Sequence, residues 1–242
     1  MGKGEKIMMR KSIEAMAAAK GLSRRDFMKG TAATAIGMAT MSLLAGCATE
    51  AAADAGKTAE ATGTVVGTTY ENLLTALQGE TNAFTKYEAF AKVAQSEGYD
   101  QIARLFQCTA DAEKIHVGLE LALAQKMNPE TKAPTGDAVH EGLTDANLIT
   151  GAQGEIYETS DMYPAFIKKA QEEGETEAVG VFTRAKLAEG YHAELYMNVY
   201  NNINDLDDSK YYLCPVCGFI HKGETEDACP VCGVLPTAFK EY

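Results

Sequence analysis

The sequence predicts a mainly α-helical protein, a four-helix bundle followed by a small metal-binding domain. Three observations support this prediction. The middle of the chain contains two copies of one helical hairpin, its C-terminal end contains two matched cysteine knuckles, and only six prolines occur in 242 residues. Because 46% of the residues are apolar and 23% are charged, the chain is neither disordered nor a polytopic membrane protein.

The first 46 residues have the composition of an export signal. Residues 23–29 read Ser-Arg-Arg-Asp-Phe-Met-Lys, and residues 30–46 are uncharged, small and apolar. This order of a basic, an apolar and a small-residue region resembles a twin-arginine signal peptide. An amphipathic helix with a chance arginine pair is the alternative. We therefore predict a signal peptide at 1–46 and an extracytoplasmic protein.

A lipid anchor is predicted directly after this signal. Residues 44–47 read Leu-Ala-Gly-Cys and resemble a bacterial lipobox, in which Cys47 is acylated. Residues 47–68 are rich in Ala, Thr and Gly, which indicates a flexible tether. The predicted membrane contact is confined to this anchor.

Charge is divided unevenly along the chain. The whole carries −12, but residues 1–46 hold eight basic and three acidic residues, so residues 47–242 carry −17. Phosphate binding needs a cationic surface. This acidic body argues against nucleic acid as a partner.

The body contains an internal duplication. Residues 77–98 and 152–174 share Gln-Gly-Glu, Tyr, Ala-Phe, Ala-Gln and Glu-Gly in the same order. Their apolar residues recur at helical spacing, and the final glycines are suited to left-handed helix caps. Two hairpins joined by one long connection at 128–144 predict a ferritin-like four-helix bundle at 69–206. The expected helices are 69–97, 99–127, 145–173 and 175–204.

The two copies differ by one residue. Glu80 precedes Gly98 by 18 residues, whereas Glu155 precedes Gly174 by 19. An inserted residue is usually accommodated as a π-bulge, and such bulges are frequent at functional sites. The second copy also has an additional acid, Glu158, near the insertion. We expect the bulge and this acid to be linked.

Two Glu-x-x-His motifs, one in each copy, give the strongest chemical signal in the bundle. Residues three apart share one helix face, so each motif presents two ligands. Two such motifs, with a glutamate from each of the other helices, form the di-iron or di-manganese pattern of ferritin-like bundles. The predicted ligands are Glu80, Glu113, His116, Glu155, Glu158, Glu189 and His192.

Charge explains why such a cluster needs metal. Buried carboxylates are strongly destabilising without partners, and two divalent ions would supply four positive charges. Nitrogen and oxygen ligands together suit redox-active iron better than calcium. A single Glu-x-x-His is more often a solvated surface pair, but two at equivalent points of a duplication favour the metal site.

Tyr87 and Tyr163 follow the Gly-Glu pairs by about two turns, and the residues alone leave two interpretations open. They are core aromatics with satisfied hydroxyls, or donors to the metal-binding carboxylates. The remaining glutamates are expected at the surface or behind the ligands: Glu88, Glu97, Glu120, Glu173 and Glu194.

Residues 207–242 contain two Cys-Pro-Val-Cys-Gly knuckles separated by 11 residues. Two knuckles allow four thiolates to surround one ion, and the glycines permit the tight turns. Zinc ribbons and one-iron rubredoxins share this spacing, so zinc stays an alternative to iron. Disulfides, common in exported proteins, are disfavoured by the matched knuckles. The predicted ligands are Cys214, Cys217, Cys229 and Cys232, and Cys108 is expected to be a packed thiol.

Together these motifs resemble the rubrerythrin family over residues 69–242. Gly154-Glu155-x-x-Glu158 followed by Asp-Met-Tyr-Pro is typical of that family. The resemblance implies a ferritin-like bundle holding two irons and a rubredoxin-like metal-knuckle domain holding one Fe(Cys)4 iron.

By this resemblance the protein is a non-haem di-iron peroxidase that reduces hydrogen peroxide to water in oxidative stress defence. Electrons would reach the di-iron site through the Fe(Cys)4 centre. One iron would be held by Glu158 when oxidised and by His116 when reduced. Tyr87 and Tyr163 would lie near the site.

Assembly and electron supply are also implied. Rubrerythrins usually form dimers in which one subunit's rubredoxin domain lies near the other's di-iron site, so a homodimer or larger homo-oligomer is expected. An extended chain is not expected to fold its own tail back onto its bundle. Export would separate the protein from cytosolic nicotinamide-dependent reductases, which leaves an unidentified extracytoplasmic donor. Twin-arginine export carries folded proteins, so both metal sites could be loaded beforehand.

Two rival functions stay open. A ferroxidase or iron-handling protein would use the same bundle with O2, and a large hollow oligomer would favour it, although the metal-knuckle tail disfavours it. A non-enzymatic module with a zinc ribbon would leave seven matched ligands without a role.

Overall fold

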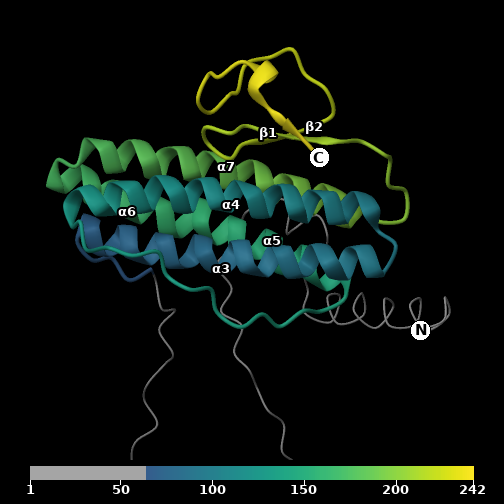
Figure 1. Cartoon of the computed structure of the whole chain (residues 1–242), viewed down its shortest axis with the longest axis horizontal. Helices are drawn as coiled ribbons and strands as arrows, with labels where there is room; N and C mark the ends of the chain where they lie inside the picture. Colours follow the sequence, from purple (N-terminus) through teal and green to yellow (C-terminus); the bar gives the residue numbers. More distant parts are fainter. Residues whose placement is uncertain (1–63) are drawn as a thin grey trace, which may run out of the picture. The chain divides into compact units, whose positions relative to one another are not determined.

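Helices dominate residues 64–242, the part of the chain that the computed structural model describes (Figure 1). The first hairpin comprises α3 (Thr69–Ser96) and α4 (Asp100–Met127). The second comprises α5 (Thr144–Tyr157), η1 (Glu158–Met162), α6 (Tyr163–Glu173) and α7 (Thr176–Asn201). This confirms the mainly α, ferritin-like bundle. The signal peptide, Cys47 and most of the tether lie outside the described residues.

The hairpin turns follow from glycine. Gly98 and Gly174 have φ of 82° and 77°, a left-handed conformation that costs glycine little. At the opposite end of α3, Thr68 and Glu71 form a capping box. The connection at 128–143 returns along α3, where Gln78 Nε2 donates to the Thr135 carbonyl at 3.1 Å.

The inserted residue of the second copy is accommodated as a π-helix. This segment, η1, begins at Glu158 and runs to Met162, between α5 and α6. The expected π-bulge near Glu158 is therefore confirmed. Because a π-helix forms i→i+5 hydrogen bonds, such as that from the Tyr163 nitrogen to the Glu158 carbonyl, η1 absorbs one extra residue, and Tyr163 occupies the place that Tyr87 has on α3.

Two glutamates tie the hairpins together. Glu173 Oε2, at the end of α6, accepts from the backbone nitrogen of Thr69 at 2.8 Å. Glu97 Oε2, after α3, accepts from the backbone nitrogen of Thr144 at 3.0 Å. Each acid thus caps the first turn of a helix in the other hairpin and complements its dipole.

Two apolar clusters lie on either side of the metal-binding layer. One contains Tyr87, Phe90 and Phe106, and the other contains Tyr163 and Phe166. Along α3, Ala76 belongs to the second cluster and Ala83 to the first, with Glu80 between them. The polar layer therefore lies between two apolar clusters that pack the helices together. Within the described residues, no helix has the length and apolarity needed to span a membrane.

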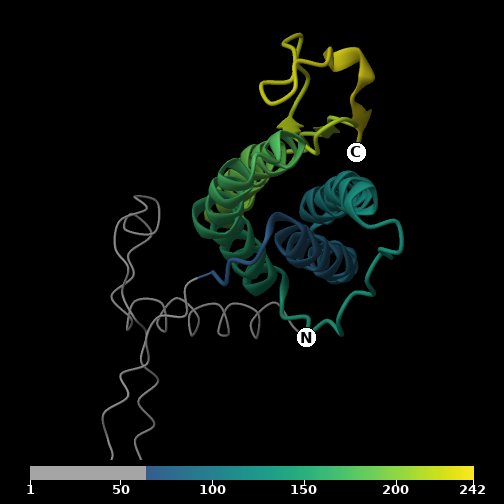
Figure 2. The ribbon, with the colours of Figure 1, turned by 90° about the vertical axis from the view of Figure 1, so that its left-hand side faces the viewer.

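The C-terminal tail forms a small antiparallel sheet. β1 (Tyr211–Leu213) pairs with β2 (Ile220–Lys222) and β3 (Lys240–Glu241), and the 3-10 turn η2 (Pro236–Ala238) precedes β3. β1 contacts α4, and β2 contacts both α4 and α7. Figure 2 shows the tail over this side of the bundle. The division between residues 206 and 207 stays a prediction.

The tail folds back onto its own bundle, so the expectation that an extended chain could not easily do this was wrong. The C-terminus of α7 and the first turns of α4 lie at the same end. A turn follows α7, and Asp207 accepts from Gln101 Nε2 at 2.5 Å. Further along α4, Asp111 Oδ2 accepts from Lys240 Nζ at 2.9 Å and Tyr242 Oη at 2.5 Å.

Replacing Glu173 by alanine is expected to destabilise the bundle because the α3 N-terminus loses its cap. The expected fall in Tm is roughly 2–4 °C, typical of losing one helix cap in a chain of this size. The matched control is Glu172→Ala, since Glu172 is exposed and its ion pair with Lys168 is 4.0 Å long. Equal Tm shifts in thermal melts of both variants would contradict the capping role.

Candidate metal sites

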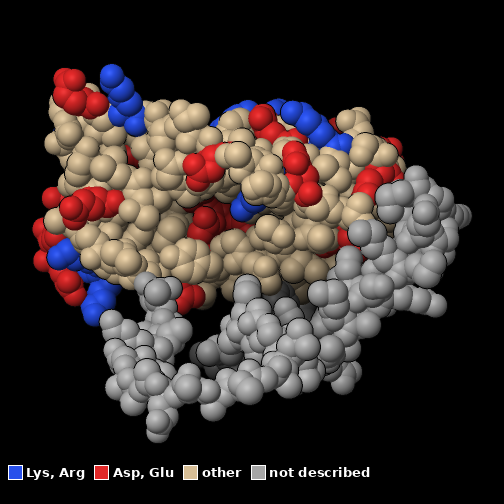
Figure 3. All heavy atoms as spheres, turned by 90° about the horizontal axis from the view of Figure 1, so that it is seen from below, with Lys and Arg blue, Asp and Glu red and all other residues tan. Residues whose placement is uncertain are grey.

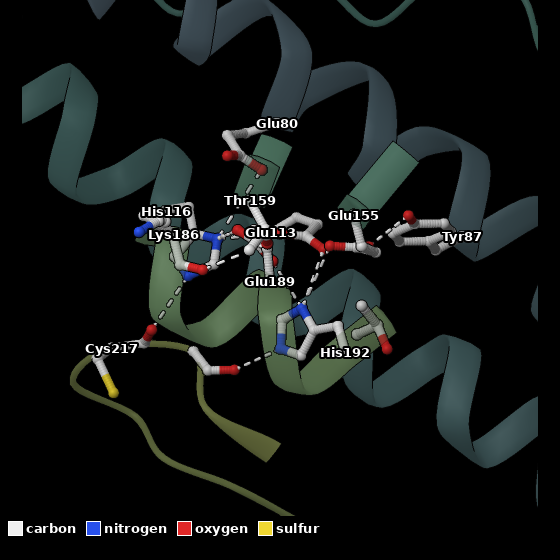
Figure 4. A network of polar contacts seen from close by, with 12 residues as sticks. Glu80, Tyr87, Glu113, His116, Glu155, Thr159, Lys186, Glu189, His192 and Cys217 are labelled. Atoms are coloured by element: carbon white, nitrogen blue, oxygen red, sulfur yellow. Dashed lines mark hydrogen bonds and ion pairs between the residues drawn. The ribbon is translucent and has the colours of Figure 1, made fainter. Parts of the chain in front are cut away.

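Six of the seven predicted bundle ligands converge in one buried layer (Figure 4). They form two overlapping groups, and within each group the ligand atoms lie within 4.8 Å of one another. Glu189 belongs to both groups: its Oε1 is 2.7 Å from His116 Nδ1 and its Oε2 is 2.7 Å from His192 Nδ1. The first group is Glu80, Glu113, His116 and Glu189, and the second is Glu113, Glu155, Glu189 and His192.

The chemistry of this layer fits a pair of metal ions. Several buried polar atoms that face the layer lack a hydrogen-bond partner, which costs free energy unless a cation satisfies them. Two groups sharing Glu113 and Glu189 match two ions bridged by carboxylates. The unpaired atoms of these ligands are Glu80 Oε2, Glu113 Oε1, Glu155 Oε2, Glu189 Oε1 and Oε2, and His192 Nδ1.

The tail fixes the tautomers of both histidines. His116 Nε2 lies 3.0 Å from the Cys217 carbonyl and His192 Nε2 lies 2.8 Å from the Gly218 carbonyl. A carbonyl only accepts, so each Nε2 carries a proton and each Nδ1 faces the carboxylates as a ligand atom. Gly218, with φ of 78°, permits this approach, because a Cβ there would lie 2.4 Å from His116 Nε2.

In the absence of metal, protons must compensate the charge of the layer. Burial and the neighbouring Glu189 raise the pKa of Glu113 well above its ordinary value and that of Glu155 to about 7. Burial lowers the pKa of His116 and His192, but the facing Glu189 carboxylate raises it more, so the net shift is upward. Burial raises the pKa of Glu189, but the two facing histidines lower it by more, so the net shift of the Glu189 pKa is downward.

Both tyrosines donate to ligand carboxylates. Tyr87 Oη donates to Glu155 Oε1, and Tyr163 Oη donates to Glu80 Oε1. Both rings are fully buried in the apolar clusters. Both interpretations of these tyrosines therefore apply, because each is a core aromatic whose hydroxyl orients a ligand carboxylate.

Glu158 lies beside the layer but in neither ligand group. Its side chain is 8% exposed, whereas Glu80, Glu113, Glu155 and Glu189 are fully buried. The nearest atom to a Cβ placed on Gly79 would be Glu158 Oε1, at 3.9 Å, so the carboxylate lies close to that glycine of α3. Figure 3 shows acidic atoms recessed within a hollow of one face of the molecule.

The four knuckle cysteines form a second site. Their Sγ atoms lie 3.5–3.6 Å apart where paired as Cys214–Cys217, Cys214–Cys232 and Cys217–Cys229. Tetrahedral coordination at about 2.3 Å separates sulfurs by about 3.8 Å, close to these distances. The five cysteines of the described residues are free, so disulfides are absent there and a single ion fits the tail. Cys108 is fully buried, as expected.

The sequence did not predict the contribution of the tail to this site, and it left the position of Glu120 open between the surface and the back of the ligands. The carbonyls of the first knuckle contact the bundle histidines, and no side-chain motif signals such a contact. Glu120 is fully buried, and its Oε1 lies 2.9 Å from Tyr163 Oη. Glu120 follows His116 by four residues and therefore shares its helix face, and this spacing is the feature of the sequence that indicates a place near the metal layer.

A ferritin-like bundle with a carboxylate and histidine layer, joined to a tail with four clustered cysteines, defines a two-centre iron protein. Comparison with known proteins agrees. The rubrerythrin family model matches residues 71–200, and the model for twin-arginine translocation signals matches residues 21–41. The chain belongs to the rubrerythrin family, whose iron cofactors suit both sites, and it carries a signal for the twin-arginine route.

Individual relatives cover most of the body. Nigerythrin of Nitratidesulfovibrio vulgaris is 61% identical over 74% of this chain and 89% of its own length. Rubrerythrin of the same organism is 33% identical over 68% of this chain and 88% of its own length. A solved structure of nigerythrin in the fully reduced, all-ferrous state has a TM-score of 0.73 and 58% identity. It covers 75% of this chain and 91% of that one.

The metal-free protein is expected to lose stability as pH rises from about 5 to 8. Its folded state retains protons on Glu113, Glu155 and the two histidines that the unfolded chain releases, so folding binds protons. Metal replaces those protons, so the loaded protein should not show this fall. We expect a drop in Tm of roughly 10 °C for the metal-free form alone. A metal-free Tm that rises over this range in thermal melts would contradict the assignment.

Proposed function

We propose that this protein is a non-haem di-iron peroxidase that reduces hydrogen peroxide to water, with electrons delivered through its Fe(Cys)4 centre. The observation that supports this function is the contact of both site histidines with the Cys217-Gly218 knuckle. Iron storage needs no electron-transfer domain, whereas repeated peroxide reduction needs two electrons in every turnover. Membership of a family that contains oxidoreductases agrees with this proposal.

The residues of the site provide a closed, preorganised environment for this reaction. Glu80, Glu113, Glu155, Glu189, His116 and His192 would hold two irons. Bound there, ferrous iron polarises the O–O bond and supplies one electron per ion. The two tyrosine hydroxyls keep Glu80 and Glu155 in one orientation, and burial excludes bulk water.

Glu158 and His116 are proposed as alternating ligands of one iron position. His116 belongs to a ligand group, whereas Glu158 lies close by in none. In the proposed cycle His116 would be the ligand of the reduced state and Glu158 the ligand of the oxidised state. The π-helix places Glu158 at the edge of the layer, from which its side chain could turn toward the metal after oxidation.

We further propose that each tail serves the di-iron site of its own chain. Three points along α4, at Gln101, Asp111 and His116, bind the tail of the same chain. Tyr211 of β1 is fully buried within the bundle's apolar cluster, which strengthens this docking. Electrons would then pass from the knuckle thiolates through the Cys217-Gly218 backbone to the histidines.

We propose that the protein functions outside the cytoplasm. The twin-arginine signal suggests export, and acylation of Cys47 would tether the protein to a membrane. An extracytoplasmic reductant would then have to reduce the tail, and a homodimer or larger homo-oligomer is proposed from the family. A ferroxidase or iron-handling role with O2 is the alternative, and the docked four-cysteine tail argues against it.

The fully reduced, iron-loaded protein should be oxidised rapidly by hydrogen peroxide and slowly by O2. Anaerobic stopped-flow mixing, followed through the visible absorption of the Fe(Cys)4 centre, measures both rates. Cys214→Ser should retain one rapid oxidation of the di-iron site but lose steady-state turnover with a reducing donor. Faster oxidation by O2 than by peroxide would favour the ferroxidase, and sustained turnover of Cys214→Ser would refute the tail as relay.

Subunit mixing distinguishes relay within a chain from relay between chains. Cys214→Ser disables the tail, and Glu189→Gln disables the di-iron site. If each tail serves its own bundle, mixed chains should stay inactive in steady-state peroxide reduction. Random pairing with transfer between subunits would instead restore about a quarter of wild-type activity and refute the proposal. Exchange between differently tagged wild-type chains, followed by native mass spectrometry, is the control.

A further inference from the structure

Glu120 is a fully buried carboxylic acid that neither ligand group contains. It lies on α4, one turn beyond His116. The equivalent position of the second repeat is Tyr196, just as Glu113 is equivalent to Glu189. The duplication therefore has an acid on one side of the metal layer and a phenol on the other.

The hydroxyl of Tyr163 connects this acid to the site. Tyr163 Oη is hydrogen-bonded to Glu80 Oε1 and lies 2.9 Å from Glu120 Oε1. A phenol has one proton and donates it to one acceptor. Because Glu80 faces the metal layer as a ligand, the Tyr163 proton belongs to that contact. The second contact then needs a proton on Glu120, which donates to Tyr163 Oη.

The surroundings of Glu120 favour its neutral form. Glu80 faces it from α3, His116 from its own helix, Tyr163 from α6 and Glu189 from α7. Burial and the Glu80 charge raise its pKa well above the ordinary value, although the Tyr163 hydroxyl and His116 oppose this. Glu120 Oε2 has no hydrogen-bond partner, which a neutral acid tolerates better than a carboxylate.

We propose that Glu120 is a protonated acid that donates to Tyr163 and stores a proton for peroxide reduction. This inference rests on the proposed function. Reduction of one hydrogen peroxide to two waters consumes two electrons and two protons. The electrons come from the reduced protein, and one proton comes from solvent.

The other proton originates at Glu120. As the Glu120 O–H bond breaks, its proton passes to Tyr163 Oη, while the hydroxyl proton of Tyr163 passes to Glu80 Oε1. Glu80 in turn releases this proton to the oxygen product, which becomes water. Glu120 is left as a carboxylate and regains its proton from solvent before the next turnover. Glu120 thus acts through Tyr163 and does not touch the reacting atoms.

The test compares Glu120→Gln, which retains the shape of the side chain without an acidic proton, with wild type. The matched control is Tyr196→Phe, which removes a fully buried hydroxyl at the equivalent position of the second repeat. Iron content, infrared spectra of the iron-loaded oxidised protein, and single-turnover oxidation by peroxide in H2O and D2O are measured. Tyr163→Phe, which breaks the connection but keeps Glu120, is the second variant.

Glu120→Gln should keep its iron, lose one protonated-carboxyl C=O band and react about 100-fold more slowly, the lower end for general acid catalysis. Glu120→Gln and Tyr163→Phe should also lose the solvent isotope effect, whereas Tyr196→Phe should match wild type. An unchanged infrared band, a wild-type rate with an unchanged isotope effect, or loss of iron from Glu120→Gln would overturn the proposal. If wild type itself does not react with peroxide, the proposed function fails, but the infrared band still decides whether Glu120 is protonated.

Discussion

Charge compensation around Glu189 is the constraint on which the rest of the structure depends. Fully buried carboxylates from α3, α4, α5 and α7 face one another there, and an uncompensated layer of this kind would oppose folding. Protons supply the compensation without metal, and two irons supply it in the loaded protein. The apolar clusters on both sides, the short helix caps and the docked tail all hold helices together that like charges would otherwise separate.

The duplication provides these stabilising contacts in pairs, with one contact from each repeat. Tyr87 and Tyr163 each donate to a ligand of the other repeat, and Glu97 and Glu173 each cap a helix of the other repeat. The departures from symmetry are therefore informative, because a pair that functioned identically would have no need to differ. Two departures lie at the metal layer: the π-helix with Glu158, and Glu120 opposite Tyr196. Both lie where the oxidised and reduced states of a redox cycle would differ.

The sequence was sufficient for the helices, the π-helix and the six residues that converge in the buried layer, since periodicity, a one-residue insertion and Glu-x-x-His spacing are local signals. That these residues, together with Glu158, bind iron stays a prediction. The sequence was not sufficient for the tail. Its direction depends on single polar contacts such as Asp207 with Gln101 and Asp111 with Tyr242, which leave no pattern in the chain. For Glu120 the sequence left two positions open, at the surface or behind the ligands. An isolated glutamate in a helix is usually solvated, and the contact with a hydroxyl from a distant helix shows that this one lies behind the ligands.

The docked tail is part of the di-iron site as well as a neighbour of it. Its two carbonyls hold the Nε2 protons of His116 and His192, and so decide that Nδ1 of each ring is left for metal. Gly218 is needed for this contact, since any larger residue would push His116 out of the layer. Because movement of the tail would disturb ligand geometry as well as electron supply, docking and metal binding must be coupled. A chain folded and loaded before twin-arginine export would preserve both, whereas one exported unfolded would have to assemble two metal centres and their contact together.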